Sequence, residues 1–139
     1  MISITKLLMD SPNYGDQLRY EPKAHECKNG VAPGRGPVVV WNCTKTCNLS
    51  CVHCYARSEA IKYQNELTHE EGIALIDQLA DFKVPVILFS GGEPLLRPDF
   101  FELANYAASK GIRPTISTNG TCITPDVAQK LKDMGVGYV

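Results

Sequence analysis

The sequence predicts an α/β protein with a parallel sheet, and three observations indicate this fold class. Short, continuously apolar runs recur along residues 37–139, as expected for parallel strands buried on both faces. Segments with helical periodicity and clear end signals separate these runs, and a polar turn follows each run. Successive βα units cross over with right-handed geometry, so the strands should lie parallel with the helices outside. Residues 1–36 carry too many prolines and glycines for a long element and are predicted to form an irregular leader.

The first βα unit is predicted from the apolar residues 38–41 and from a helix that begins after Thr68. Thr68 and Glu71 have the spacing of a capping box, in which each residue bonds the backbone of the other. One face of this helix is apolar and consists of Ile73, Ile76, Leu79 and Ala80. The cysteine-rich segment between strand and helix therefore falls at the carboxyl end of a strand.

Two further units follow. Residues 86–89 are predicted to form the second strand, and residues 98–110 a helix that stops at Gly111. Its sheet-facing side is expected to contain Phe101, Ala104, Ala107 and Ala108. The third unit has a strand at 113–117 and a helix with Thr124 as N-cap that stops at Gly135. Residues 137–139 read as the start of a fourth strand.

Composition restricts the function classes. The chain has 139 residues, of which 44% are hydrophobic and 21% charged, typical of one folded domain. The net charge is -1 and the 14 lysines and arginines are scattered, which argues against nucleic acid or an anionic membrane as a partner. No run approaches the ~18 apolar residues of a membrane span, and the start lacks a secretory signal, so a cytoplasmic location is expected.

Cysteine spacing indicates a metal centre. Cys47, Cys51 and Cys54 form a Cys-x3-Cys-x2-Cys segment that offers three thiolates to an iron–sulfur cluster and leaves one iron open for chemistry. Cys43 offers a fourth thiolate, although its position at a strand end favours packing as a small apolar residue. A non-catalytic iron–sulfur or zinc module with four thiolates is therefore the alternative reading.

Two other turns are predicted to meet the cysteine segment, because sites in parallel sheets form at the carboxyl ends of strands. Residues 91–94 read Gly-Gly-Glu-Pro and residues 117–120 read Ser-Thr-Asn-Gly. Gly91 and Gly92 permit a positive φ and close backbone approach to a ligand, and Glu93 can add an acceptor or fix the turn. Turn chemistry alone is the alternative explanation of both segments.

In this order along the chain, the three motifs resemble the radical S-adenosylmethionine superfamily over roughly residues 37–139. The resemblance implies the first three to four βα units of that family's partial barrel. It also implies a 4Fe-4S cluster on the three cysteines, with S-adenosylmethionine chelated by its unique iron. Reductive cleavage would then yield methionine and a 5'-deoxyadenosyl radical for hydrogen abstraction. Residues expected to contact the cofactor, or to line the substrate side, are His53, Gly91, Gly92, Glu93, Ser117, Thr118 and Asn119.

A finer resemblance involves the leader, including His25 and residues 33–37, together with the first strand. These segments are similar to the heme d1 and alternative heme biosynthesis subgroup, which implies a small-molecule, tetrapyrrole substrate and an electron donor such as a ferredoxin or flavodoxin. His25 and Cys27 are otherwise expected at the surface. Because the family's barrel has about six units, residues 37–139 are expected to be the N-terminal portion of a truncated core domain.

Overall fold

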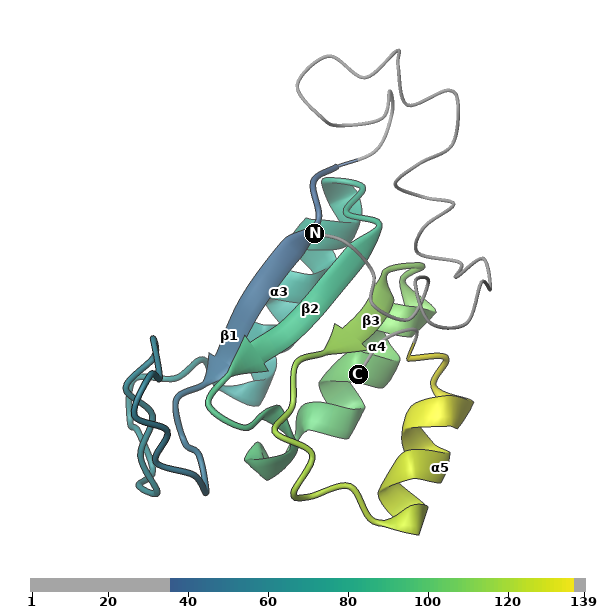
Figure 1. Ribbon diagram of the computed structural model, residues 1–139. Coiled ribbons are helices and arrows are strands. Elements are labelled where there is room, and N and C mark those ends of the chain that lie inside the picture. The colour runs from purple at the N-terminus through teal and green to yellow at the C-terminus, as the bar shows by residue number, and fades with distance from the viewer. Residues whose placement is uncertain (1–35, 137–139) are drawn as a thin grey trace, which may run out of the picture. The chain divides into compact units, whose positions relative to one another are not determined.

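The computed structural model describes residues 36–136 and contains a three-stranded parallel sheet in the order β1-β2-β3. The strands are β1 (Val39–Thr44), β2 (Val86–Gly91) and β3 (Arg113–Ile116). The helices are α3 (His69–Asp81), α4 (Phe100–Ser109) and α5 (Pro125–Asp133), and a short 3-10 helix η3 (Pro94–Leu96) follows β2. Figure 1 shows α3 and α4 on the same face of the sheet. The predicted fold class is confirmed.

The chain divides into two units, Met1–Gly34 and Arg35–Val139, and the second contains every helix and strand above. The predicted leader with His25 and Cys27, and the predicted fourth strand at 137–139, lie outside the described residues. No helix within residues 36–136 is long and apolar enough to cross a membrane.

An aromatic row runs through the core between sheet and helices. The ring centroids of Trp41 and Phe89 are 5.6 Å apart, and Phe89 meets Phe100 of α4 edge-on at 5.4 Å. Phe89 and Ile76 have no exposed surface. Burying side chains of this size contributes about 1.5–3 kcal/mol each, so this layer stabilises the packing of the helices on the sheet.

The register between β1 and β2 shifts by one residue at Cys43. Asn42 pairs with Ser90 and Thr44 pairs with Gly91, so β1 uses two residues where β2 uses one. The shift breaks the in-and-out alternation of the strand: Asn42 is exposed, whereas Cys43 and Thr44 are both buried. The first strand is thus longer than predicted and includes Cys43.

The predicted starts of α3 and α5 are confirmed. Thr68 and Glu71 form the capping box of α3, and Thr124 caps α5 by accepting a hydrogen bond from the Val127 N–H. The expected start of α4 at residue 98 was wrong by two residues. Asp99 is its N-cap but makes no side-chain cap bond, because its carboxylate binds Arg97 and His69 instead.

The buried face of α4 also differs from the prediction. Ala104 and Ala107 are buried as expected, but Phe100 and Leu103 are buried in place of Phe101 and Ala108, which are half-buried. The buried stripe of α4 therefore differs from the predicted one by about one position. Phe101 still contacts the edge of the core and the ring of Phe100.

Candidate cofactor site

The carboxyl ends of β1 and β2 are joined by backbone contacts that only glycine permits. Gly92 N–H donates to the Thr44 carbonyl at 2.7 Å, and Glu93 N–H donates to the Thr46 carbonyl at 2.9 Å. A Cβ on Gly91, whose φ is +121°, would lie 2.1 Å from the Thr44 oxygen, and one on Gly92 would lie 2.2 Å from the Thr46 oxygen. The Gly-Gly pair therefore presses the second strand end against the segment that leads into the cysteines.

Glu93 connects this turn to the end of β3. The residue has no exposed surface. Its Oε1 accepts hydrogen bonds from the Leu95 N–H at 3.0 Å and the Thr118 hydroxyl at 2.7 Å, and its Oε2 accepts from the Asn119 N–H at 2.7 Å. Glu93 was predicted either to add an acceptor or to fix the turn, and these contacts show that it fixes the turn. They also confirm that the motifs at 91–94 and 117–120 converge.

The cysteine segment is a loop closed at its base. Cys47 N–H donates to the Glu59 carbonyl at 3.0 Å beside a parallel bridge between Thr46 and Glu59. Cys47 is buried, Cys51 is exposed and Cys54 is half-buried. The first thiol therefore faces the protein while the other two lie toward the open side of the loop.

Several hydrogen-bond donors are directed at the sulfur atoms. Cys47 Sγ accepts from the Leu49 N–H at 3.4 Å and from the Asn119 amide at 3.7 Å. The backbone N–H of Ser58 lowers the pKa of the Cys54 thiol below its usual value, although partial burial acts in the opposite direction. Donors of this kind stabilise thiolates, which are the form that binds metal.

The donor set has the chemistry of an iron–sulfur site, since its three side chains are cysteines with free thiols. The cysteines among residues 36–136 are free, and within that range no three His, Cys, Asp or Glu side chains surround one metal-ion position. A cluster with several irons takes each thiolate at a different iron, so its ligands need not converge on one point. The loop offers three thiolates of this kind. Two of them are accessible, and hydrogen-bond donors are directed at the sulfurs.

Cys43 is part of the core. Its side chain is 2% exposed and its thiol donates to the Ser90 carbonyl at 3.5 Å. Burial raises the pKa of the Cys43 thiol to about 12, even though the nearby Arg97 acts to lower it. A thiol that is buried and protonated at neutral pH is a poor metal ligand, which argues against the four-thiolate alternative.

Two clamps that sequence reasoning missed hold the base of the loop. Glu66 Oε1 accepts from the Thr44 hydroxyl at 3.0 Å and the Lys45 N–H at 2.7 Å. Buried Arg97 donates to the Cys43 carbonyl at 2.7 Å and to the Leu67 carbonyl at 2.8 Å. Its Nε lies 2.8 Å from Oδ1 of Asp99. Except for Asp99, these partners lie far from Glu66 or Arg97 in sequence, and no local pattern indicates them.

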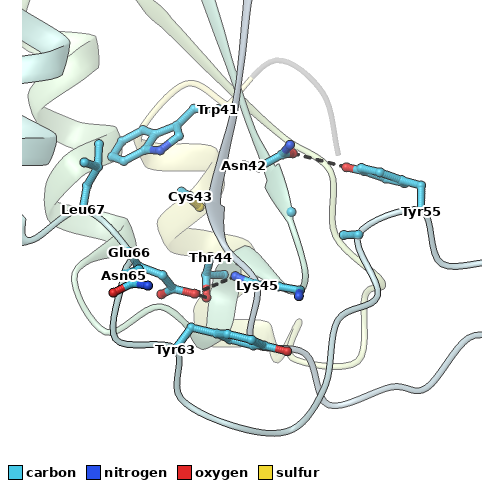
Figure 2. A pocket seen from close by; sticks show the side chains of 12 residues that line it. Trp41, Asn42, Cys43, Thr44, Lys45, Tyr55, Tyr63, Asn65, Glu66 and Leu67 are labelled. Carbon is cyan, nitrogen blue, oxygen red and sulfur yellow. Dashed lines mark hydrogen bonds between the residues drawn. The ribbon is translucent and has the colours of Figure 1, made fainter.

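A cavity of about 520 Å³ opens beside the end of β1. Figure 2 shows Tyr55 on one side of it, directed at Asn42, and Glu66 bound to Thr44 and Lys45 on another. The Tyr55 hydroxyl lies 3.2 Å from Asn42 Oδ1 and 3.3 Å from Ser90 Oγ. Of the residues predicted for the site, only Gly91 lines this cavity, so the cavity lies beside the cysteines rather than around them.

The remaining predicted residues lie at the open side of the strand ends. His53 and Ser117 are exposed, and Thr118 is half-buried. Asn119 is exposed but fully engaged through its side chain. Asn48 and Thr121 bind Asn119 and were not predicted, although each adjoins a residue of a predicted motif.

The fold and the site define an α/β protein whose cysteine loop meets two further turns at the carboxyl ends of parallel strands. Residues 41–139 match the family model described as the radical SAM superfamily. The chain therefore belongs to the radical S-adenosylmethionine superfamily, as its three motifs predicted.

Three curated relatives are similar to this chain. Fe-coproporphyrin III synthase of Methanosarcina barkeri is 51% identical over 142 residues, covering 100% of this chain and 36% of the relative. AdoMet-dependent heme synthase of the same organism is 43% identical over 99 residues, covering 71% and 28%. Pre-heme d1 synthase of Dinoroseobacter shibae is 39% identical over 127 residues, covering 91% and 30%. The chain thus spans about a third of the length of these relatives.

Among solved structures, the crystal structure of BtrN in complex with AdoMet and 2-DOIA matches with a TM-score of 0.60 and 27% identity. The match covers 73% of this chain and 43% of that chain. It agrees with the partial radical SAM barrel expected from the sequence.

Proposed function

We propose that the cysteine loop holds a 4Fe-4S cluster through Cys47, Cys51 and Cys54 and that the chain binds S-adenosylmethionine at the converging strand ends. The main support is the contact network that brings the three motifs together. It includes the packing of Gly91 and Gly92 and the hydrogen bonds that Glu93 accepts from Thr118 and Asn119. Family membership supports the same assignment. When bound, the cluster would supply an electron for cleavage of the sulfonium to methionine and a 5'-deoxyadenosyl radical, and this chemistry would serve hydrogen abstraction from a substrate.

The chain's own residues would act as a frame for these groups. Gly91 and Gly92 would hold the second strand end against the carbonyls of Thr44 and Thr46, and so fix the turn beside the cysteine segment. Exposed His53 and Ser117 are available for contact with the cofactor from the open side. Thr118 and Asn119 line the same edge of the site while Glu93 holds them in place.

We further propose a tetrapyrrole as the class of substrate and a ferredoxin or flavodoxin as the electron donor. The names of the relatives support the first, since they describe Fe-coproporphyrin III, heme and pre-heme d1 synthases. The net charge of -1 offers no reason to expect nucleic acid or an anionic membrane surface. Free thiols at a cluster site favour the reducing cytoplasm. Residues 37–139 would be the cofactor-binding portion of the core domain.

Anaerobic reconstitution tests the proposal. The reduced protein should show a cluster signal in electron paramagnetic resonance that changes when S-adenosylmethionine is added, and dithionite should then yield 5'-deoxyadenosine. Cys51→Ser should abolish both results, whereas Cys122→Ser, at a cysteine outside the loop, should retain them. A signal indifferent to S-adenosylmethionine, or tight zinc binding with four thiolates, would refute the proposal.

A further inference from the structure

The side chain of Asn119 reaches across from the end of β3 to the first cysteine. Its Nδ2 lies 3.7 Å from Cys47 Sγ and donates to Asn48 Oδ1 at 2.9 Å. These partners are 72 and 71 residues away in the chain. This side chain is therefore a direct contact between the Ser-Thr-Asn-Gly turn and the cysteine loop.

The orientation of the Asn119 amide follows from its other partners. The Thr121 backbone N–H lies 2.9 Å from the amide oxygen, Oδ1, and a backbone N–H can only donate. The atom facing Thr121 must accordingly be the oxygen. The atom facing Cys47 Sγ is then the NH₂ group, which makes the contact a donor directed at sulfur.

A closed ring of hydrogen bonds keeps the amide in this position. Asn119 Nδ2 donates to Asn48, Asn48 Nδ2 donates to the Thr121 hydroxyl at 2.7 Å, and that hydroxyl donates to Asn119 Oδ1 at 2.7 Å. Each member both donates and accepts, so the bonds polarise one another. The ring holds the residue after Cys47 as well as the amide that faces the sulfur.

The backbone of Asn119 is held from the other side. Its N–H donates to Glu93 Oε2 at 2.7 Å, and Glu93 is completely buried in the turn after β2. Both the backbone and the side chain of Asn119 are thus fixed, by partners on two different strand ends. Such a residue has the rigidity needed to orient a metal ligand through a hydrogen bond.

We propose that Asn119 is a positioning residue for Cys47. The N–H···S hydrogen bond from the Asn119 amide fixes this ligand and raises the reduction potential of the cluster. The inference rests on the proposed function. Reduction adds negative charge to a cluster and its thiolates, and a donor to the sulfur stabilises that charge. The wild-type bond therefore raises the potential, and its loss should lower it.

Comparison of two substitutions tests this role, because both remove the bond to Asn48 and only one places a negative charge beside the sulfur. Asn119→Asp keeps an oxygen for the Thr121 N–H but replaces the NH₂ group, the donor to sulfur and to Asn48, with an anionic oxygen. Asn119→Ala removes the whole amide. Asn105→Ala, on the exposed side of α4, is the matched control. The full 139-residue chain is reconstituted in each case, and the cluster is titrated with reductant under paramagnetic-resonance detection.

We expect the potential to decrease from wild type to Asn119→Ala and further to Asn119→Asp, with Asn105→Ala unchanged. A tenfold decrease in the equilibrium constant for one-electron reduction, the size expected for Asn119→Asp, corresponds to about 59 mV. If Asn119→Ala assembles no cluster, the reduction potential of the Asn119→Asp protein alone tests the proposal.

The two proposals fail in different ways. A wild-type potential in Asn119→Asp overturns the role of Asn119 while leaving the S-adenosylmethionine response of the wild-type cluster intact. A wild-type protein that assembles no cluster, or whose cluster ignores S-adenosylmethionine, overturns the proposed function itself.

Discussion

The sheet with its helices and the loops at the strand ends are stabilised by different kinds of interaction. The sheet layer is held by apolar packing among residues such as Phe89, Ile76 and Phe100, each with at most 1% of its surface exposed. The strand ends are held by hydrogen bonds to partners distant in sequence, which Glu93 and Glu66 accept and Arg97 donates. The difference shows that one layer provides stability and the other provides geometry, so substitutions in the two layers should be separable by experiment.

The largest effect is expected in the apolar layer. Phe89→Ala should lower the free energy of unfolding by about 3–5 kcal/mol, because it leaves a cavity between Trp41 and Phe100. Denaturant titration measures the loss. Phe82→Ala, at a site 66% exposed, is the control and should be close to neutral. Equal losses at the two positions would contradict the argument that burial of Phe89 stabilises the sheet.

Glu93 tests the polar layer. Glu93→Ala leaves three donors without their acceptor and should destabilise the protein by about 2–3 kcal/mol, while Glu93→Gln keeps one acceptor oxygen and should cost less. Hydrogen exchange should show reduced protection of the Asn119 amide. Glu102→Ala, a 75% exposed carboxylate, serves as the control. Unchanged protection of Asn119 would show that Glu93 does not hold the turn.

Cys43 lies where the apolar layer meets the strand ends, and the pH dependence of stability tests its burial. The folded state raises the pKa of this thiol from 9.0 to about 12, so unfolding releases its proton at any pH between these values. The contribution of the Cys43 thiol to the free energy of unfolding is fully present below pH 9. Between pH 9 and pH 12 it decreases by about 1.4 kcal/mol per pH unit. Cys43→Ala should reduce the slope of stability against pH in this window, whereas Cys122→Ala should not. Identical slopes in all three proteins would refute the burial argument.

The smallest effect is expected at the helix caps, which lie at the edge of both layers. Thr68→Ala removes the capping-box acceptor for the Glu71 N–H and should cost about 1 kcal/mol. Thr124→Ala removes the equivalent bond to Val127 in α5 and provides a matched comparison. Thermal melting measures both. The cluster signal per folded molecule should not change in either variant, and a change would mean that helix position affects the site.

The two layers also differ in how far the sequence predicts them. Apolar runs and cap residues such as Thr68 predicted the strands, the helices and the convergence of their ends, because these signals are local. The buried face of α4 was misassigned, because Phe100 and Phe101 are both apolar and periodicity alone does not decide which of them faces the sheet. The clamps at Glu66 and Arg97 were not predictable, because their partners are chosen by the tertiary fold and leave no periodic pattern.

Closure of the cysteine loop at Glu59 has a consequence for chain length. The bond from Cys47 N–H to the Glu59 carbonyl, with the Thr46 hydroxyl bound to the Ile61 carbonyl, separates residues 48–58 from the residues that lead on to Glu66. Residues 62–65 lie between this closure and the Glu66 clamp. Residues inserted there would lengthen a surface loop, and the entropic cost of closing the loop would be small, about 0.6 kcal/mol for each doubling of its length. The spacing of the three cysteines would be preserved, which makes this segment suitable for an inserted tag or label.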